Sequence, residues 1–141
     1  MSWDKEEYRY LVDTTVLVDH LRGREWASRI LKREDVVISY VTVAELIKGV
    51  RNKEELRVVL EWVMSFRVLW GGEDSNQLAV YLLKKYRLRS GFGFLDALIA
   101  SIAILDGLVL VTDNVKHFKR IAGLEVIRPR QLLKESQQGQ K

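Results

Sequence analysis

The stretch RYLVDTTVLVDHLRG, residues 9–23, places an acid directly behind a short apolar run. Tyr10–Val12 has the length and composition of a buried β-strand, and Asp13 follows it without a break. A carboxylate at the edge of an apolar core is costly unless another group satisfies it. Because no Arg or Lys adjoins Asp13, its partner lies elsewhere in the chain or outside the protein.

Short apolar runs alternate with helical patterns along the rest of the chain. This alternation predicts βαβ units, and hence an α/β fold in which helices cover both faces of a parallel sheet. We expect one domain over residues 1–133 and a frayed, polar tail over residues 134–141. The predicted strands are Tyr10–Val12, Val36–Val41, Val68–Trp70, Leu108–Val111 and Glu125–Ile127. The predicted helices are Val16–Arg22, Trp26–Lys32, Val43–Arg51, Lys53–Ser65, Ser75–Leu88 and Leu95–Asp106.

The composition is that of an ordinary globular domain. The 141 residues are 48% hydrophobic and 30% charged, which argues against an intrinsically disordered chain. The sequence contains no cysteine, so disulfides and thiolate metal sites are excluded. Its charged N-terminus does not resemble a signal peptide, and its longest apolar run, Ala97–Leu105, is too short to span a membrane. We therefore expect a cytoplasmic protein without a membrane segment, and the net charge of +4 is compatible with a nucleic-acid partner.

Four acids fall where the predicted strands end or the predicted helices begin. Asp13 ends the first strand, and Asp113 follows the fourth strand. Glu45 lies in the first turn of the helix after the second strand, and Asp96 lies in the first turn of an almost wholly apolar helix. Because the carboxyl ends of parallel strands meet at one edge of the sheet, we expect these four side chains to lie close together.

Such a cluster needs protons or cations, because two like charges about 4 Å apart repel by roughly 4 kcal/mol at an effective dielectric constant of about 20. Mg²⁺ and Mn²⁺ take carboxylate and water oxygens as ligands. A metal ion held in this way can polarise a phosphoryl oxygen and activate water for hydrolysis. Lys and Arg on the surface can hold the phosphate backbone of a nucleic acid. The acids and the basic surface are therefore compatible with a metal ion that acts on the phosphate backbone of a nucleic acid.

Each acid also has a structural explanation that the sequence leaves open. Asp13 can cap the helix after it, and Asp113 can cap a short helix that follows. Glu45 completes a capping box that begins at Thr42, in the pattern TVAE. Asp96 suits a helix N-terminus through the helix macrodipole. The four acids together are therefore more informative than any one of them.

Other polar residues near the acids are assigned smaller roles. Asp19 lies two helical steps after Asp13, so it falls near the acids or on a solvated face of its helix, and the solvated face is favoured. His20 and His117 are expected on the surface or in loops, because their separation does not fit a metal-ligand spacing. Three hydroxyl groups are placed to orient the carboxylates through hydrogen bonds, namely those of Thr14, Ser39 and Thr112.

Four stretches, in this order, resemble the PIN domain family, and within it the VapC-type ribonuclease toxins of toxin–antitoxin pairs. They are YLVDTTVLVDHLRG, ISYVTVAELIKGV, FGFLDALIASIAI and LVLVTDNVKHFKRIAGLEV. The resemblance runs from Arg9 to Pro129, nearly the whole chain. It implies a three-layer α/β/α fold with a central, mainly parallel sheet of about five strands.

The resemblance also implies an Mg²⁺- or Mn²⁺-dependent endoribonuclease that forms a homodimer and is held inactive by a cognate, VapB-like antitoxin. It assigns Asp13 and Asp96 as metal ligands, and Glu45 as a ligand directly or through water. At the fourth acid position, in the family's T-x-[DN] motif, this chain has Asn114, with Asp113 just before it. Either Asp113 turns into the site, or Asn114 takes the position with a carbonyl oxygen.

We therefore expect hydrolysis of RNA by metal-activated water, which leaves a 5′-phosphate and a 3′-hydroxyl. One alternative is a PIN-like module that binds RNA without cutting it. Another is a phosphoacceptor receiver domain, which is disfavoured because Thr14, and not a second acid, follows Asp13. Basic residues close to the motifs are candidates for phosphate contacts, namely Arg22, Lys48, Arg51, Lys116 and Lys119.

Overall fold

The computed structural model describes the backbone of residues 8–88 and 91–139, and within these ranges the side chains up to residue 134. Strands and helices alternate along these residues. The strands are β1 (Tyr10–Val12), β2 (Val36–Ser39), β3 (Val68–Leu69), β4 (Val109–Val111) and β5 (Val126–Ile127). The helices are α1 (Thr14–Leu21), α2 (Glu25–Leu31), α3 (Tyr40–Lys48), α4 (Lys53–Val63), α5 (Glu73–Tyr86), α6 (Phe94–Asp106), α7 (Val115–Phe118) and α8 (Pro129–Gly139).

The five strands are parallel and form one sheet in the order β3-β2-β1-β4-β5. The register of the central pair places Tyr10 of β1 opposite Val109 of β4, and Val12 opposite Val111. The chain order reverses between β1 and β4, since β2 and β3 lie on one side of β1 and β4 and β5 on the other. In open parallel sheets, ligands bind at the carboxyl ends of the strands beside such a reversal.

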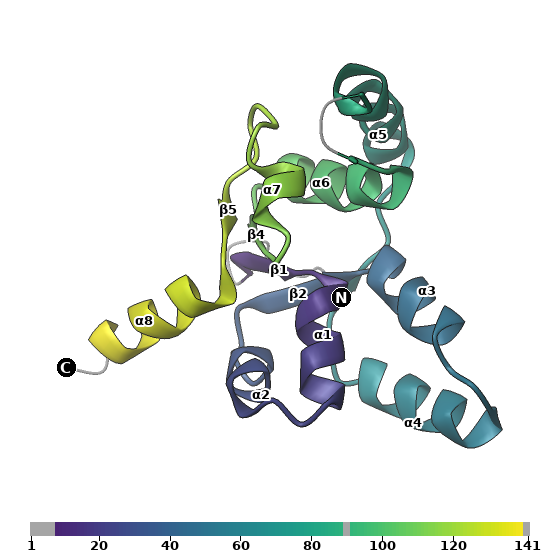
Figure 1. Cartoon of the computed structure of the whole chain (residues 1–141), viewed down its shortest axis with the longest axis vertical. Helices are drawn as coiled ribbons and strands as arrows, with labels where there is room; N and C mark the ends of the chain where they lie inside the picture. The colour runs from purple at the N-terminus through teal and green to yellow at the C-terminus, as the bar shows by residue number, and fades with distance from the viewer. Residues whose placement is uncertain (1–7, 89–90, 140–141) are drawn as a thin grey trace.

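Both faces of the sheet are apolar, and different helices cover them (Figure 1). Because alternate residues of a strand point to opposite faces, Leu11 packs in a core with α5 and α6. Its neighbours Tyr10 and Val12 pack in a second core with α1, α2 and α4. Val37 of β2 and Leu110 of β4 follow Leu11 into the first core. The predicted three-layer α/β/α arrangement is therefore confirmed.

The predicted elements agree closely with the observed ones, and the largest difference in a helix start is at α3. This helix begins at Tyr40 because the Ser39 hydroxyl accepts a hydrogen bond from the backbone N–H of Thr42 at 3.3 Å. Ser39 is therefore the N-cap, so the predicted capping box at Thr42–Glu45 is wrong. Ser39 holds the start of α3, and not a carboxylate as predicted. Glu45 lies in the second turn, where its carboxylate is not needed for capping.

The C-terminal segment also differs from the prediction. Helix α8 continues to Gly139, where the sequence predicts a frayed tail from residue 134, and residues 140–141 lie outside the described residues. Leu132 is fully buried in the second core and anchors the helix, and the Lys, Glu and Gln residues after it favour helix. Within the described ranges, no helix combines the length and apolar character that crossing a membrane requires.

Candidate active site

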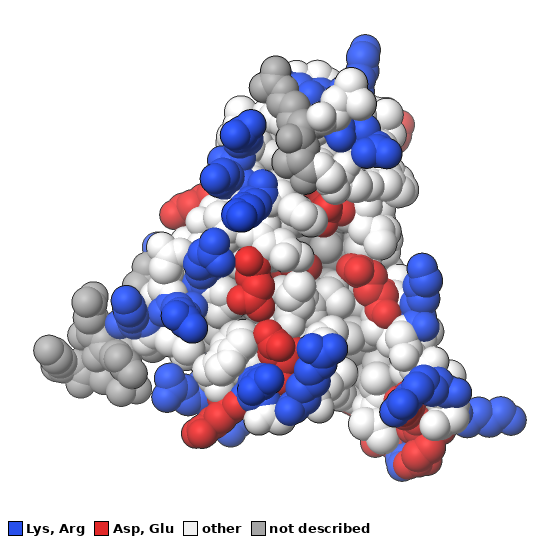
Figure 2. Space-filling view, viewed as in Figure 1, with Lys and Arg blue, Asp and Glu red and all other residues white. Residues whose placement is uncertain are grey.

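The carboxyl ends of the strands open into a hollow of about 380 Å³ whose lining includes acids from separate elements. Asp13 precedes α1, Asp19 lies in α1, Glu45 in α3, Asp96 in α6 and Asp113 in the loop after β4. In Figure 2, acidic side chains gather where α1, α3 and α7 meet, with Lys and Arg side chains around them. The structure thus brings together the four predicted acids and adds Asp19. This hollow is named the acidic pocket below.

Asp13 is the most buried of these acids, with 6% of its surface exposed. Its Oδ1 accepts a hydrogen bond from the backbone N–H of Thr14 at 2.6 Å, and its Oδ2 accepts one from the Thr112 hydroxyl at 2.6 Å. Burial raises the pKa of Asp13 above its ordinary value, the two hydrogen bonds oppose the rise, and the charge of Asp96 adds to it. Asp13 is therefore both the cap of α1 and a member of the pocket.

Glu45 reaches the pocket from α3. Its Oε1 accepts a hydrogen bond from the Thr14 hydroxyl at 2.8 Å, and the Thr42 hydroxyl lies 3.0 Å from that of Thr14. Burial raises the pKa of Glu45, the Thr14 hydrogen bond lowers it, and the charges of Asp13 and Asp96 raise it again. Thr14 therefore orients a carboxylate, as predicted from the sequence.

Asp96 is held at the start of α6. Its Oδ2 accepts a hydrogen bond from the backbone N–H of Gly93 at 3.1 Å, which closes the first turn of the helix. The same oxygen lies 3.4 Å from Nδ1 of His117. The sequence predicted His117 on the surface or in a loop. The single turn of α7 instead brings the ring back toward α6, and no spacing pattern in the sequence signals this contact.

Asp113 and Asn114, the two candidates for the fourth position, both line the acidic pocket. Burial raises the pKa of Asp113, the charge of Asp19 and a hydrogen bond to it raise the pKa further, and Asp13 adds to the effect. The nearby guanidinium of Arg128 opposes the rise. Negative charge therefore also predominates on the side of the pocket where Asp113 lies.

One face of α1 lines the pocket, and this face includes Asp19, for which the sequence favoured a solvated position. Thr15, Val18, Asp19 and Arg22 all border the hollow. They are spaced at i, i+3, i+4 and i+7, which places them on a single face of a helix. Asp19 is therefore in the pocket and not on the solvated face. The spacing in the sequence marks these residues as one helix face, and the structure shows that this face turns toward the pocket.

The donor set of the pocket fits a hard divalent cation. Carboxylate oxygens are the protein ligands that Mg²⁺ and Mn²⁺ prefer, and the raised pKa values mark carboxylates whose charge is not compensated. Among the described residues, no three acidic or histidine side chains already surround one point at ligand spacing. Since Mg²⁺ keeps several water ligands and takes few carboxylates directly, a preformed cage is not required.

The predicted basic residues differ in what they contact. Arg22 lines the acidic pocket, and the charge of Lys48 lowers the pKa of Glu45. Arg51 pairs with Glu55 at 2.8 Å, which engages its guanidinium within the protein. Two further cations are exposed on α7 and directly after it, Lys116 and Lys119.

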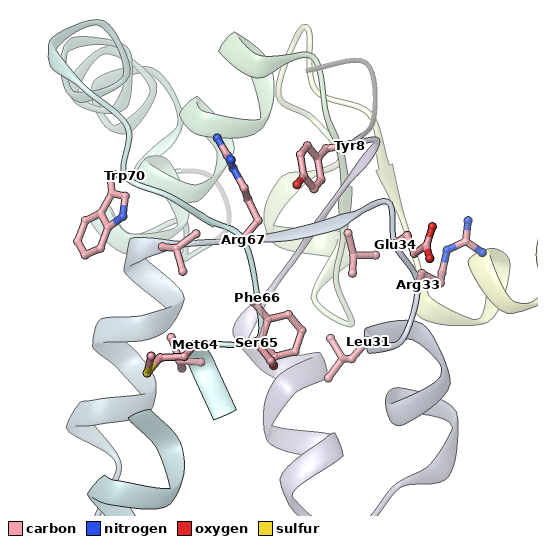
Figure 3. Close-up of a pocket in the computed structure, with 12 residues that line it drawn as sticks. Tyr8, Leu31, Arg33, Glu34, Met64, Ser65, Phe66, Arg67 and Trp70 are labelled. Atoms are coloured by element: carbon pink, nitrogen blue, oxygen red, sulfur yellow. The ribbon is translucent and has the colours of Figure 1, made fainter. Parts of the chain in front are cut away.

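A larger hollow of about 830 Å³ lies at the opposite edge of the sheet, beside the amino ends of β2 and β3. Figure 3 shows Tyr8, Arg67 and Trp70 around it. Arg33, which also lines it, forms a bidentate ion pair with Asp35 at 2.9 Å. None of the candidate catalytic residues is among the described residues that line this hollow.

Comparisons with known proteins agree with the geometry. Residues 10–124 match the PIN domain family. The chain is 41% identical over 115 residues to ribonuclease VapC10 of Mycobacterium tuberculosis, covering 77% of this chain and 84% of that protein. It is 35% identical over 125 residues to ribonuclease VapC1 of Rickettsia felis, covering 83% of this chain and 93% of that protein.

The fold is also similar to a solved structure, a toxin–antitoxin complex from Klebsiella pneumoniae. The TM-score is 0.72 at 29% sequence identity, and the superposition covers 85% of this chain and 97% of the chain in that complex.

Proposed function

Because the chain belongs to the PIN domain family and resembles its VapC ribonucleases in sequence, we propose that it is a metal-dependent endoribonuclease, the toxin of a toxin–antitoxin pair. The observation that carries the proposal is the acidic pocket, where acids from separate elements meet beside the strand reversal. A receiver-type signalling domain does not fit this family. Because the proposed substrate is RNA, we expect the protein to act in the cytoplasm.

We assign the metal to Asp13 and Asp96, with Glu45 as a ligand directly or through water. Asp113 or Asn114 completes the set. When bound, Mg²⁺ or Mn²⁺ supplies charge neutralisation for a phosphate and activation of the attacking water. Hydrolysis of an RNA phosphodiester at its P–O3′ bond would leave products with a 5′-phosphate and a 3′-hydroxyl.

The chain's own hydroxyl groups keep the carboxylates in place for this chemistry. Thr112 fixes one oxygen of Asp13, and the backbone N–H of Asn114 donates to the Thr112 hydroxyl at 3.0 Å. Thr14 fixes one oxygen of Glu45. Because each carboxylate has a second oxygen, these bonds leave one oxygen of Glu45 free to contact a cation or a water ligand.

The experiment is cleavage of a labelled, mixed-sequence RNA by the purified protein with Mg²⁺ or Mn²⁺ and, in parallel, with EDTA. We expect cleavage that requires the metal and yields 5′-phosphate ends. Asp96→Asn protein, purified in the same way, is the control for a contaminating nuclease, and it should not cut. Equal cleavage by both proteins would contradict the assignment of the site.

The second candidate function, an RNA-binding module without catalysis, rests on Asn114 at the position where the family often carries an acid. It predicts that wild-type and Asp96→Asn proteins both bind RNA, and that neither cuts it with either metal. Asn114→Asp then separates the two functions, because it should create cleavage only in a protein that lacked the fourth acid.

The partners follow from the same family assignment. The solved complex from Klebsiella pneumoniae is described as a toxin–antitoxin complex, which supports a VapB-like antitoxin for this chain. Co-expression with the small protein encoded beside it should suppress RNA cleavage. A homodimer is supported by exposed apolar side chains on the packed helices α5 and α6, including Tyr81 and Phe94. Light scattering should then give twice the chain mass of 16.4 kDa.

The basic residues around the pocket are proposed to hold the RNA backbone. Arg22 is the strongest of the predicted set, because it lines the acidic pocket. Lys48, Lys116 and Lys119 rank below it, because they are not among the described residues that line the acidic pocket. Arg51 is the weakest, because Glu55 already neutralises its guanidinium.

A further inference from the structure

Arg128 occupies a position on the sheet edge that the candidate phosphate contacts do not include. It directly follows β5, whose Ile127 is in register with Val111 of β4. The backbone N–H of Thr112 donates to the carbonyl of Ile127 at 3.1 Å, so the carboxyl ends of β4 and β5 lie side by side. The residues that follow the five strands at this edge are Asp13, Tyr40, Trp70, Thr112 and Arg128. Arg128 is the one cation among them.

The backbone of Arg128 is fixed on both sides. Its N–H donates to Oε1 of Gln131 at 2.8 Å, and Pro129 begins α8 directly after it. Proline restricts the residue before it to extended conformations, which further limits the backbone. The guanidinium therefore projects from a defined position, although the side chain is exposed to solvent.

The guanidinium lies against the loop that carries the fourth acid position. Nη1 donates to the backbone carbonyl of Asp113 at 3.4 Å, a long hydrogen bond. A guanidinium has five N–H donors, so this single bond leaves most of them available. Planar, bidentate geometry makes Arg well suited to phosphate oxygens. The guanidinium thus contacts the loop of Asp113, which lines the acidic pocket, and the side chain is exposed, so its other donors are accessible to a ligand.

We propose that Arg128 is a phosphate-binding residue of the RNA site, and that it holds a backbone phosphate beside the Asp113 loop. The inference rests on the proposed ribonuclease function. It also accounts for how a polyanion approaches a pocket lined by acids. Arg22 presents a positive charge from the end of α1, and Arg128 presents one from the junction of β5 and α8.

Arg130 is the matched control, because it has the same chemistry in the same segment. It lies two residues further on, within α8, and is also exposed. Like Arg128, it is not part of the lining of the acidic pocket, but it does not directly follow a strand, and among the described residues it is Arg128 that donates to the Asp113 carbonyl. The comparison of Arg128→Ala with Arg130→Ala therefore separates a local phosphate contact from a general loss of positive charge.

The test is the salt dependence of RNA binding. A short fluorescent single-stranded RNA is titrated with Asp96→Asn protein in EDTA at several KCl concentrations, and anisotropy is recorded. Each lost phosphate contact reduces the slope of log K against log[salt] by about 0.7 for a single strand. Arg128→Ala in this background should weaken binding several-fold and reduce the slope by that amount, while Arg130→Ala leaves the slope unchanged. Arg128→Lys should restore most of the slope, because it keeps the charge.

Cleavage gives an independent readout in the otherwise wild-type protein. Arg128→Ala should raise KM and leave kcat nearly unchanged, because the lost contact binds ground state and transition state alike. A fall in kcat with an unchanged salt slope would overturn the proposal, since Arg128 would then only support the Asp113 loop. Equal slopes for Arg128→Ala and Arg130→Ala would also overturn it. If the wild-type protein fails to cut RNA but the slope changes as expected, the ribonuclease proposal fails and the phosphate contact stands.

Discussion

Two of the hollows formed by the described residues, at opposite edges of one sheet, differ in how their charges are satisfied. The larger, at the amino ends of β2 and β3, is lined in part by apolar side chains, and Arg33 there pairs with Asp35. The guanidinium of Arg67 lies 5.5 Å from the centre of the Tyr8 ring. The smaller, at the carboxyl ends, holds acids that bind hydroxyl and backbone N–H groups.

Uncompensated charge, and not volume, therefore distinguishes the candidate active site from the larger hollow. A charge that is paired within the protein supports the fold, so its removal is expected to change the free energy of unfolding. A group of buried carboxylates with raised pKa values is unfavourable by itself, and the rest of the fold holds it together. A bound cation would reduce this electrostatic cost.

The largest effect is expected from Asp13→Asn, which removes a proposed metal ligand. Loss of several kcal/mol of transition-state stabilisation corresponds to a fall in kcat/KM on the order of 10²- to 10³-fold. The matched control is Glu34→Gln, an exposed acid that lines the larger hollow. It should leave cleavage of the labelled RNA unchanged, and a comparable loss in both variants would remove the distinction between the hollows.

A smaller effect is expected from Thr112→Val, which removes the hydroxyl that donates to Asp13 Oδ2. Oδ2 of the buried carboxylate then keeps only the longer hydrogen bond from the Thr15 hydroxyl at 3.4 Å, so the free energy of unfolding should fall by about 1–3 kcal/mol. Cleavage should fall by about 10- to 100-fold, because the acid is no longer held in place. Thr112→Ser keeps the hydroxyl and should restore both values. Urea denaturation and the cleavage assay measure the two effects, and no rescue by serine would contradict the role of the hydroxyl.

The pH dependence of stability should follow the raised pKa values of the pocket. Between the ordinary carboxyl pKa near 4 and these raised values, the folded protein binds more protons than the unfolded chain. In EDTA, the contribution of the pocket to the free energy of unfolding should therefore fall as the pH rises through that window. Asp13→Asn should make this fall shallower. Glu55, whose pKa Arg51 lowers, acts in the opposite sense in both proteins and cancels in the comparison. Urea denaturation at a series of pH values measures this pH dependence. Parallel curves for the wild-type and Asp13→Asn proteins would contradict the uncompensated burial of the pocket carboxylates.

The smallest effect is expected from His117→Ala. The imidazole lies 3.4 Å from Asp96 Oδ2 and is partly exposed, and exposed pairs contribute about 0.2–1 kcal/mol. Cleavage should therefore fall by at most about fivefold. His20→Ala, which removes a ring stacked on Trp62 away from the acids, should leave kcat unchanged. A loss as large as that of Asp13→Asn would assign His117 a direct role in the reaction.

Much of the fold was predictable because the apolar runs of β1, β2 and β4 are short and continuous. Such runs, separated by helical patterns, leave few alternatives to a parallel sheet. The start of α3 was not predictable in the same way. Ser39 and Thr42 both fit the first position of a capping pattern, and only the point where β2 ends decides between them.

The acids themselves were predictable because they stand at the ends of strands and the starts of helices. The sequence left Asp19 either near the acids or on a solvated face and favoured the wrong alternative, because it does not show which face of α1 turns to the sheet edge. His117 and Arg128 reach the site through turns after β4 and β5. The path of a loop depends on tertiary packing, which local patterns do not encode.

The most direct test of the central claim is thermal unfolding of the protein with and without Mn²⁺. A pocket that lacks a cation should gain about 2.7 kcal/mol of stability at a roughly hundredfold excess of metal over its Kd, so Tm should rise with Mn²⁺ concentration. Asp13→Asn protein should lose most of this rise and Glu34→Gln protein should keep it. Equal rises in all three proteins, or no rise in the wild type, would contradict the assignment of the acidic pocket as a metal site.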